Sequence, residues 1–239
     1  MLIGIRDLAL QGGLRYPRAM SIAENPVLPK FIVLEGTDGT GTTTQLKTIH
    51  EALARAGIPH WTTCEPTDGP IGRLIRRILG GELRAAPGTV AHLFAADRHE
   101  HLYGAEGIAE RLGRGEVVVC DRYILSSLAY QGSACGLQLP LSLNAAFPLP
   151  GLLLYFDVDP HLSMSRIEGR ERRDIYETLS FQELVRSTYE EAMRLYEPSG
   201  MEIRRIDASL TRAEVSGAVL ADLERRLGLE PGLLRGNDR

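Results

Sequence analysis

The sequence predicts an α/β protein built on a five-stranded parallel sheet with helices on both faces. Short apolar runs alternate along the chain with segments of helical periodicity. A helix between two consecutive strands implies a right-handed crossover, and such crossovers produce a parallel sheet covered on both sides. The 239 residues contain neither internal repeats nor an internal linker, so one domain with a substantial core is expected.

The apolar runs and the periodic segments place the elements in order. Five strands are expected at 31–35, 61–64, 116–120, 152–158 and 202–206. The first helix carries Leu46, Ile49 and Leu53 on one face and ends at Gly57. Further helices are expected at 71–79, 90–112 and about 124–130, after the fourth strand, and on each side of the fifth strand.

Three of the later helix starts carry capping residues. Asp159 precedes a proline at the first helical position, where proline is well tolerated. Two other starts have the capping-box spacing of Ser or Thr with Glu three residues later: Ser180 with Glu183, and Thr211 with Glu214. Each pair is expected to open an amphipathic helix.

The domain is expected to span residues 30–228. Residues 1–29 contain an early Gly-Gly pair and three prolines without a clean period, so they are interpreted as an N-terminal extension. Met20 is an alternative start. Residues 229–239 are rich in Pro, Gly and polar side chains, and they are expected to form a frayed tail.

Composition excludes several classes of protein. The formal net charge of −4 argues against general nucleic-acid binding. No apolar stretch approaches the roughly 20 residues of a membrane span, and the N-terminus lacks the pattern of a secretory signal. The three cysteines, Cys64, Cys120 and Cys135, form no CxxC pair and are interpreted as reduced thiols. A cytoplasmic location is therefore expected.

A glycine-rich loop follows the first strand directly. It reads Gly36, Thr37, Asp38, Gly39, Thr40, Gly41, Thr42 and Thr43. The glycine spacing and terminal Thr match GxxxxGK[ST] in the strand–loop–helix context that supports such a match. Glycines let the backbone wrap around phosphate oxygens, and the amide N–H groups and helix N-terminus supply positive potential. The Thr43 hydroxyl occupies the position that binds Mg²⁺.

Thr42 departs from the pattern. Lysine at this position would bring a charge to the β- and γ-phosphates of a nucleotide, whereas threonine brings none. The alternative interpretation is a glycine-rich turn unrelated to phosphate.

Six segments carry a recognisable pattern: FIVLEGTDGTGTTTQ (31–45), EPTDGPIGRLIR (65–76), LFAADRHE (93–100), DRYILSSLAYQG (121–132), LYFDVDP (154–160) and IDAS (206–209). In their order and spacing they resemble the corresponding segments of thymidylate kinases. The resemblance covers about residues 30–228. The fourth segment is the most specific, because other nucleoside monophosphate kinases share the loop but not this block. The resemblance implies the P-loop NTPase fold of the nucleoside monophosphate kinase type.

The resemblance assigns roles around the loop. Asp121 would hold Mg²⁺ together with Thr43, as a Walker B aspartate does. Arg122 would contact the phosphates of donor and acceptor. Asp38 would accept a hydrogen bond from the sugar hydroxyl of the acceptor nucleotide. The alternative interpretation of Asp121 and Arg122 is an ion pair at the end of a strand. The alternative interpretation of Asp38 is an aspartate that stabilises a turn.

The resemblance also implies a dTMP site. Phe94 would stack on thymine and Arg98 would hydrogen-bond its carbonyl, although a Phe at helical spacing is by default a core residue. The remaining residues expected to bind dTMP are Glu65, Pro66, Arg73, Ser126, Tyr130 and Gln131. Tyr130 would crowd a ribose 2′-hydroxyl and so favour deoxynucleotides. The resemblance implies that Arg73 approaches the acceptor phosphate. Arg76 and Arg77 lie close by, however, and a solvated basic helix face explains these arginines nearly as well.

A lid over ATP is expected at about 166–178. Arg166 resembles the arginine that stacks on adenine, and Ala208 belongs to the loop on the adenine side. Thr44, which follows the loop, completes the predicted ATP-binding set. Because Thr40 stands where one subgroup of the family carries an arginine, the catalytic charge is expected from the lid. Its candidates are Arg170, Arg172 and Arg173.

The expected reaction is phosphoryl transfer from ATP to dTMP with Mg²⁺, giving ADP and dTDP, in dTTP biosynthesis. Two alternatives remain at this stage: a kinase of the same fold acting on another monophosphate, and a weakly active nucleotide-binding homologue, which Thr42 suggests. Thymidylate kinases are typically homodimers, so the resemblance implies a homodimer here.

Overall fold

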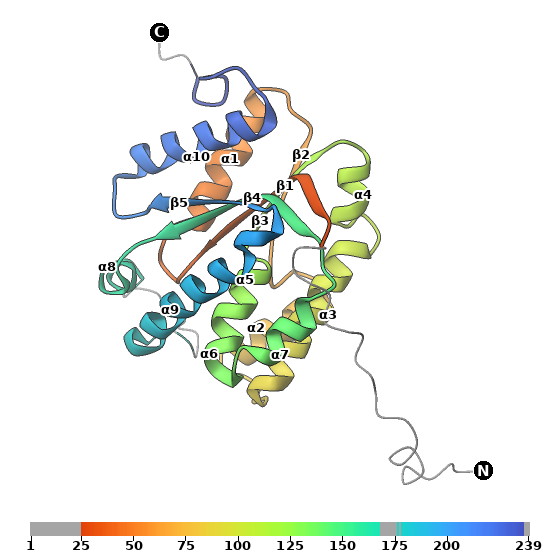
Figure 1. The fold of residues 1–239 in the computed structure, drawn as a ribbon, viewed down its shortest axis with the longest axis vertical. Coiled ribbons are helices and arrows are strands. Elements are labelled where there is room, and N and C mark those ends of the chain that lie inside the picture. The colour runs from red at the N-terminus through yellow and green to blue at the C-terminus, as the bar shows by residue number, and fades with distance from the viewer. Residues whose placement is uncertain (1–24, 168–175, 177, 237–239) are drawn as a thin grey trace, which may run out of the picture.

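The computed structural model describes residues 25–167, 176 and 178–236. Its sheet has the strands β1 (Val27–Gly36), β2 (His60–Cys64), β3 (Val117–Asp121), β4 (Leu149–Asp157) and β5 (Glu202–Asp207). All neighbouring strands are parallel, in the order β2-β3-β1-β4-β5 (Figure 1). The predicted fold class and its five strands are confirmed.

Helices pack on both faces of the sheet. On one face lie α1 (Thr42–Arg55) and α10 (Arg212–Leu227), which share a core with the β1 and β4 side chains pointing that way. The other face is covered mainly by α3, α5 and α9, as Figure 1 shows. Besides α1 and α10, the α-helices have these bounds: α2 (Pro70–Leu79), α3 (Pro87–Tyr103), α4 (Ile108–Gly113), α5 (Ile124–Ser126), α6 (Gly132–Cys135), α7 (Gln138–Asn144), α8 (Pro160–Ser165) and α9 (Leu179–Tyr196).

The register of the sheet determines which residues meet at the carboxyl ends of its strands. β1 pairs with β3 and β4 so that Leu34 lies opposite Asp121, and Gly36 lies opposite Phe156. Cys64 at the end of β2 also lies opposite Asp121. The segments that follow the first three strands therefore leave the sheet side by side, where parallel α/β sheets bind their ligands.

The helical region expected at 90–112 consists of two helices, α3 and α4, rather than one. The backbone becomes extended at Gly104, and α4 begins after Gly107. A Cβ at Gly104 would lie 2.6 Å from the carbonyl oxygen of Glu100, so glycine permits this break. The helix expected at about 124–130 is longer, since α5 continues through a π-helical turn at Ser127–Gln131 into α6.

One of the predicted capping boxes is confirmed and the other is wrong. Thr211 and Glu214 form the reciprocal bonds of a capping box at the start of α10. Ser180 instead lies inside α9, whose N-cap is Thr178 without a side-chain cap. Asp159 caps α8 by accepting a hydrogen bond from the backbone N–H of His161. Helix α7 was not predicted from the sequence.

The structured part of the chain extends beyond both bounds expected for the domain. β1 begins at Val27, and the side chain of Asn25 donates a hydrogen bond to the carbonyl of Phe147. Beyond residue 228, Leu234 is fully buried in the core formed by α1 and α10. Of the helices in the described part of the chain, none has the length and apolar character needed to cross a membrane.

Glu224 holds the C-terminal segment against α10. Its buried carboxylate accepts hydrogen bonds from the backbone N–H groups of Gly232 and Leu234. Burial alone would raise the pKa of Glu224, but these hydrogen bonds and the charge of Arg235 lower it below its ordinary value. A carboxylate whose pKa falls on folding stabilises the folded state above the pKa of the unfolded chain.

Replacing Glu224 with Gln is expected to lower the free energy of unfolding by about 1–3 kcal/mol at neutral pH, because backbone donors lose a charged acceptor. Urea denaturation measures the change. The difference between wild type and variant should shrink as the pH falls below the ordinary carboxyl value of 4.5, since Glu224 becomes protonated in the wild type. A difference that stays constant down to pH 3 would contradict this account.

Candidate active site

The glycine-rich loop wraps between the end of β1 and the start of α1. Gly39 and Gly41 have positive φ angles of 82° and 94°, which side-chain-bearing residues adopt only with strain. Gly36 packs tightly, because a Cβ there would lie 2.7 Å from Thr40 Oγ1 and 3.0 Å from the carbonyl oxygen of Phe156. Glycine at these positions therefore lets the loop turn tightly between β1 and α1.

The side-chain oxygens of Thr43, at the end of the loop, and Asp121, at the end of β3, lie next to each other. Thr43 Oγ1 donates a hydrogen bond of 2.8 Å to Asp121 Oδ2. Asp121 Oδ1 is buried and has no hydrogen-bond partner among the described residues. A buried carboxylate oxygen without a partner is costly unless a cation or donor occupies the space beside it. The pair therefore fits a hard divalent cation that takes its other ligands from phosphate oxygens and water.

Arg122 joins the loop to the helix beyond β3. Its backbone has φ of 72°, and its N–H donates to the carbonyl of Leu34 at 2.8 Å. Its Nη1 donates to the carbonyl of Gly36 at 3.0 Å and its Nη2 to Asp38 Oδ1 at 2.7 Å. The guanidinium lies 5.0 Å from the centroid of the Tyr130 ring. A non-glycine residue in this conformation costs about 1–3 kcal/mol and indicates that its surroundings hold it there.

Gln182 of α9 was missed by sequence analysis. Its Oε1 accepts a hydrogen bond from the backbone N–H of Asp38 at 3.1 Å, and its Nε2 donates to Asp38 Oδ2 at 2.7 Å. The same Nε2 donates to the carbonyl of Tyr176. Asp38 is therefore fixed from two sides, by Gln182 and Arg122. No motif indicates Gln182, because the contact joins segments far apart in the sequence.

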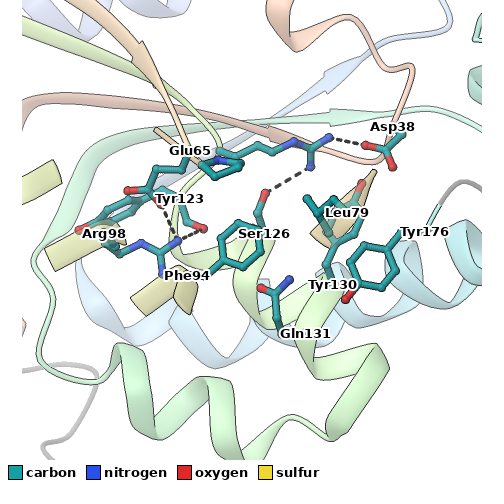
Figure 2. Close-up of a pocket in the computed structure, with 12 residues that line it drawn as sticks. Asp38, Glu65, Leu79, Phe94, Arg98, Tyr123, Ser126, Tyr130, Gln131 and Tyr176 are labelled. Carbon is teal, nitrogen blue, oxygen red and sulfur yellow. Dashed lines mark hydrogen bonds and ion pairs between the residues drawn. The ribbon is translucent and has the colours of Figure 1, made fainter. Parts of the chain in front are cut away.

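A pocket of about 570 Å³, counting the space at its open mouth, lies next to the loop. In Figure 2, Glu65 and Arg98 lie at one end, and Asp38, Tyr130 and Tyr176 lie at the other. Its walls come from the loop, the segment after β2, α2, α3, the helix after β3, and residue 176. The lining residues are Asp38, Glu65, Pro66, Leu79, Phe94, Arg98, Arg122, Tyr123, Ser126, Tyr130, Gln131 and Tyr176.

Arg98 is the buried cation of this pocket, with an exposed fraction of 1%. Its Nη2 lies 2.6 Å from Glu65 Oε2 and also donates to Ser127 Oγ at 3.0 Å. Its Nη1 donates to Asn144 Oδ1, and the guanidinium lies 4.8 Å from the centroid of the Tyr123 ring. Arg98 Nε has no partner within the described ranges, so one donor stays free at this end of the pocket.

Glu65 is shared between Arg98 and a second basic residue. Its Oε1 lies 3.1 Å from His101 Nδ1, and His101 Nε2 lies 2.8 Å from Thr63 Oγ1. Because a carboxylate only accepts hydrogen bonds, Nδ1 of a neutral His101 carries the proton and Nε2 accepts from the threonine. Asn144, Ser127 and His101 were not predicted, because each acts through contacts with Arg98 or Glu65.

Polar groups at the other end of the pocket are also available to a ligand. Gln131 Oε1 is buried without a hydrogen-bond partner in the described part of the chain. Burial raises the pKa of Tyr130 well above its ordinary value, so its hydroxyl stays protonated at neutral pH. Both residues lie in the π-helical turn, a conformation that occurs often at functional sites.

The structure brings together every residue predicted to bind dTMP except Arg73. Ser126 lines the pocket, but its Oγ donates to Glu35, so its hydroxyl is already engaged. Arg73 donates to the carbonyl of Asp68 at the surface. Arg76 instead reaches the carbonyl of Thr67 at 2.7 Å and the thiol of Cys64 at the end of β2.

The predicted ATP side of the site is described in part. Arg166 Nη1 donates a hydrogen bond of 2.9 Å to the carbonyl of Ala208, so two residues predicted to lie near adenine are in contact. The predicted catalytic arginines Arg170, Arg172 and Arg173 lie outside the described residues. Thr42 is the first residue of α1 and is buried.

Together, a phosphate loop at the switch point of a parallel sheet and an adjoining pocket for a second ligand define a P-loop kinase of nucleoside monophosphates. The family model for thymidylate kinase matches residues 34–219. The chain belongs to the thymidylate kinase family. It is therefore a phosphotransferase that moves a phosphoryl group from ATP to dTMP, and the alternative of another monophosphate substrate is not favoured.

Individual relatives agree with the family model. The chain is 44% identical to a protein of Treponema pallidum over 76% of this chain and 88% of the relative. It is 42% identical to a protein of Aeropyrum pernix over 74% and 85% of the two chains. Each is provisionally named a thymidylate kinase. The thymidylate kinase of Bacillus pumilus is 36% identical over 82% of this chain and 96% of its own.

Proposed function

We propose that Arg122 is the residue that aligns donor and acceptor in the dTMP kinase reaction. The observation that supports this is its position: its guanidinium contacts the loop at Gly36 and Asp38 and also lines the nucleotide pocket. Phosphoryl transfer needs in-line positioning and neutralisation of charge on the equatorial oxygens, with little covalent chemistry from the protein. A cation at the border of the two sites meets both needs.

We propose that Thr43 and Asp121 hold Mg²⁺, because Asp121 Oδ1 is buried and lacks a partner among the residues that the structure describes. When bound, the ion neutralises phosphate charge. Loop amide groups and the N-terminus of α1 would bind the donor phosphates. Arg166 and Ala208 would contact the adenine.

The Glu65 end of the pocket is proposed to bind thymine. Arg98 Nε is the free donor there, and a thymine carbonyl is a matching acceptor. Phe94 supplies an apolar wall for the ring. Tyr130 and Asp38 lie toward the loop, where they would contact the deoxyribose. In this proposal the 5′-phosphate of dTMP would lie beside Arg122.

A coupled assay with ATP and Mg²⁺ tests this assignment. The kcat/KM for dTMP is expected to exceed the values for CMP, UMP and AMP by at least about a hundredfold. The bases of CMP and AMP do not match the pocket, and Tyr130 would leave no room for the 2′-hydroxyl that all three ribonucleotides carry. Equal or better turnover of a ribonucleotide would refute the role given to Tyr130.

We also propose that arginines of the lid supply the positive charge that the motif's lysine would bring, because Thr42 stands at the lysine position. The candidates are Arg170, Arg172 and Arg173. If this is so, Thr42→Lys should change kcat by less than about tenfold, because the transferred phosphoryl group already has its cation. Steady-state kinetics at saturating ATP and dTMP measure this. A rise of a hundredfold or more would show that the native enzyme lacks a catalytic charge.

We propose in addition that the protein is a cytoplasmic homodimer. The three cysteines are free thiols, which suits a reducing compartment. The resemblance to thymidylate kinases supports a dimer formed through helices that flank the sheet.

A further inference from the structure

Glu35 is a buried acid that the mechanism above does not use. It is the residue of β1 directly before Gly36, and its exposed fraction is 0%. Its Oε1 accepts hydrogen bonds from the backbone N–H groups of Tyr123 at 3.0 Å and Ser126 at 3.1 Å. Its Oε2 accepts from Ser126 Oγ and lies 3.0 Å from Tyr189 Oη. Burial raises the pKa of Glu35, although the hydrogen bonds from Ser126 and Tyr189 and the charge of Arg122 oppose that rise. A buried carboxyl group is costly unless its oxygens have hydrogen-bond partners, and both oxygens of Glu35 have them.

The two backbone contacts show what this carboxylate does. Tyr123 is the N-cap of the helix that follows β3, and its own side chain makes no capping bond. The first N–H groups of a helix have no partner within the helix and need an outside acceptor. Glu35 supplies that acceptor from a different strand, because its Oε1 bridges the N-cap N–H and the N–H of Ser126, in the first turn of the helix.

Arg122 lies directly before this helix in its left-handed conformation. Its own N–H is bonded to the carbonyl of Leu34, and the next N–H, of Tyr123, is bonded to Glu35. Two consecutive residues of β1 thus fix the peptide groups on both sides of Arg122. The third, Gly36, accepts from the Arg122 side chain.

We propose that Glu35 is a positioning residue for Arg122: by capping the helix after β3, it holds Arg122 in the conformation that directs its guanidinium to the phosphate loop. This inference rests on the role proposed for Arg122. Tyr189 extends the arrangement to α9, because its Oη lies 3.2 Å from the carbonyl oxygen of Gly36 as well as next to Glu35. Glu35 itself is fully buried and is not among the residues that line the pocket.

A double-mutant cycle tests the proposal. Glu35→Met removes the acceptor, and it is expected to lower kcat by at least about tenfold, with the KM for ATP changed by less than about threefold. Glu35→Gln keeps one acceptor oxygen for the helix N–H groups, and it should retain kcat within about threefold of wild type. In an Arg122→Ala background, Glu35→Met should lower kcat by no more than about twofold further.

Glu224→Met is the matched control, because Glu224 is also buried and accepts two backbone N–H groups, and its helix α10 contributes no residue to the pocket lining. It should lower Tm and leave kcat unchanged. Should Glu35→Met not fold, Tyr189→Phe replaces it: its smaller loss of kcat should also disappear in the Arg122→Ala background.

The outcomes separate this inference from the role of Arg122. If Arg122→Ala keeps full kcat, the role of Arg122 fails and the inference fails with it. If Arg122→Ala is impaired but the two losses multiply, only the inference is overturned. A normal kcat in Glu35→Met, or a kcat in Glu35→Gln as low as in Glu35→Met, also overturns it, since a capping acceptor would then be irrelevant.

Discussion

Replacing Arg122 with Ala is expected to lower kcat for phosphoryl transfer from ATP to dTMP by at least about 10³-fold, comparable to the loss of an arginine finger. The reason is that Arg122 contacts Gly36 and Asp38 of the loop and lines the pocket proposed for the acceptor. Thr42 brings no compensating charge from the loop. A coupled spectrophotometric assay measures kcat and the KM values for both nucleotides.

Arg204→Ala is the matched control for this substitution. Arg204 lies on β5 and pairs with Asp222 at the surface, so its loss should leave kcat within about twofold of wild type. If the two variants have similar kcat values, Arg122 does not carry the charge assigned to it. A rise in the KM for dTMP with kcat unchanged would make Arg122 a ground-state binding residue instead.

Replacing Arg98 with Met is expected to lower the free energy of unfolding by about 3–5 kcal/mol, because it leaves the buried Glu65 carboxylate without its cation. The side chains of Arg98 and Glu65 are 1% and 2% exposed, and their atoms are 2.6 Å apart. Urea denaturation measures the loss. The KM for dTMP should rise in parallel, since the free donor at this end of the pocket is removed.

The double variant Glu65→Gln, Arg98→Met separates the ion pair from packing. It should be more stable than Arg98→Met alone, because an amide is much less costly to bury than an unpaired carboxylate. If the double variant is less stable than the single one by the full cost of Glu65→Gln, the two residues are not coupled. His101, which also contacts Glu65, would then hold the carboxylate by itself.

The sequence was most informative where a short segment determines its own structure. The glycine-rich loop lies between a strand and a helix as its motif predicted, and Thr211 with Glu214 caps α10 as expected. The strands were found because continuous apolar runs bounded by polar residues fit a sheet buried on both faces. The pocket was found through resemblance, since its residues come from segments far apart in the sequence.

What the sequence missed depends on contacts between distant segments. Gln182, Asn144 and His101 each stabilise a site residue from another element, and no local pattern distinguishes them from ordinary helix residues. Glu35 did carry a signal, because a charged residue at the end of an apolar strand must find partners when the strand is central. The helix break at Gly104 was missed because apolar residues, such as Leu102 and Ile108, lie on both sides of it.

Gln182 links the glycine-rich loop, the proposed site of the donor phosphates, to the segment that leads into α9. Its side chain contacts both the backbone and the carboxylate of Asp38, and it also donates to the carbonyl of Tyr176, which lines the pocket proposed to bind dTMP. A ligand that moves Asp38 or Tyr176 must therefore change the hydrogen bonds of the same Gln182 amide group. Free energy exchanged between two binding sites is reciprocal, so any effect of dTMP on ATP affinity through this amide equals the effect of ATP on dTMP affinity.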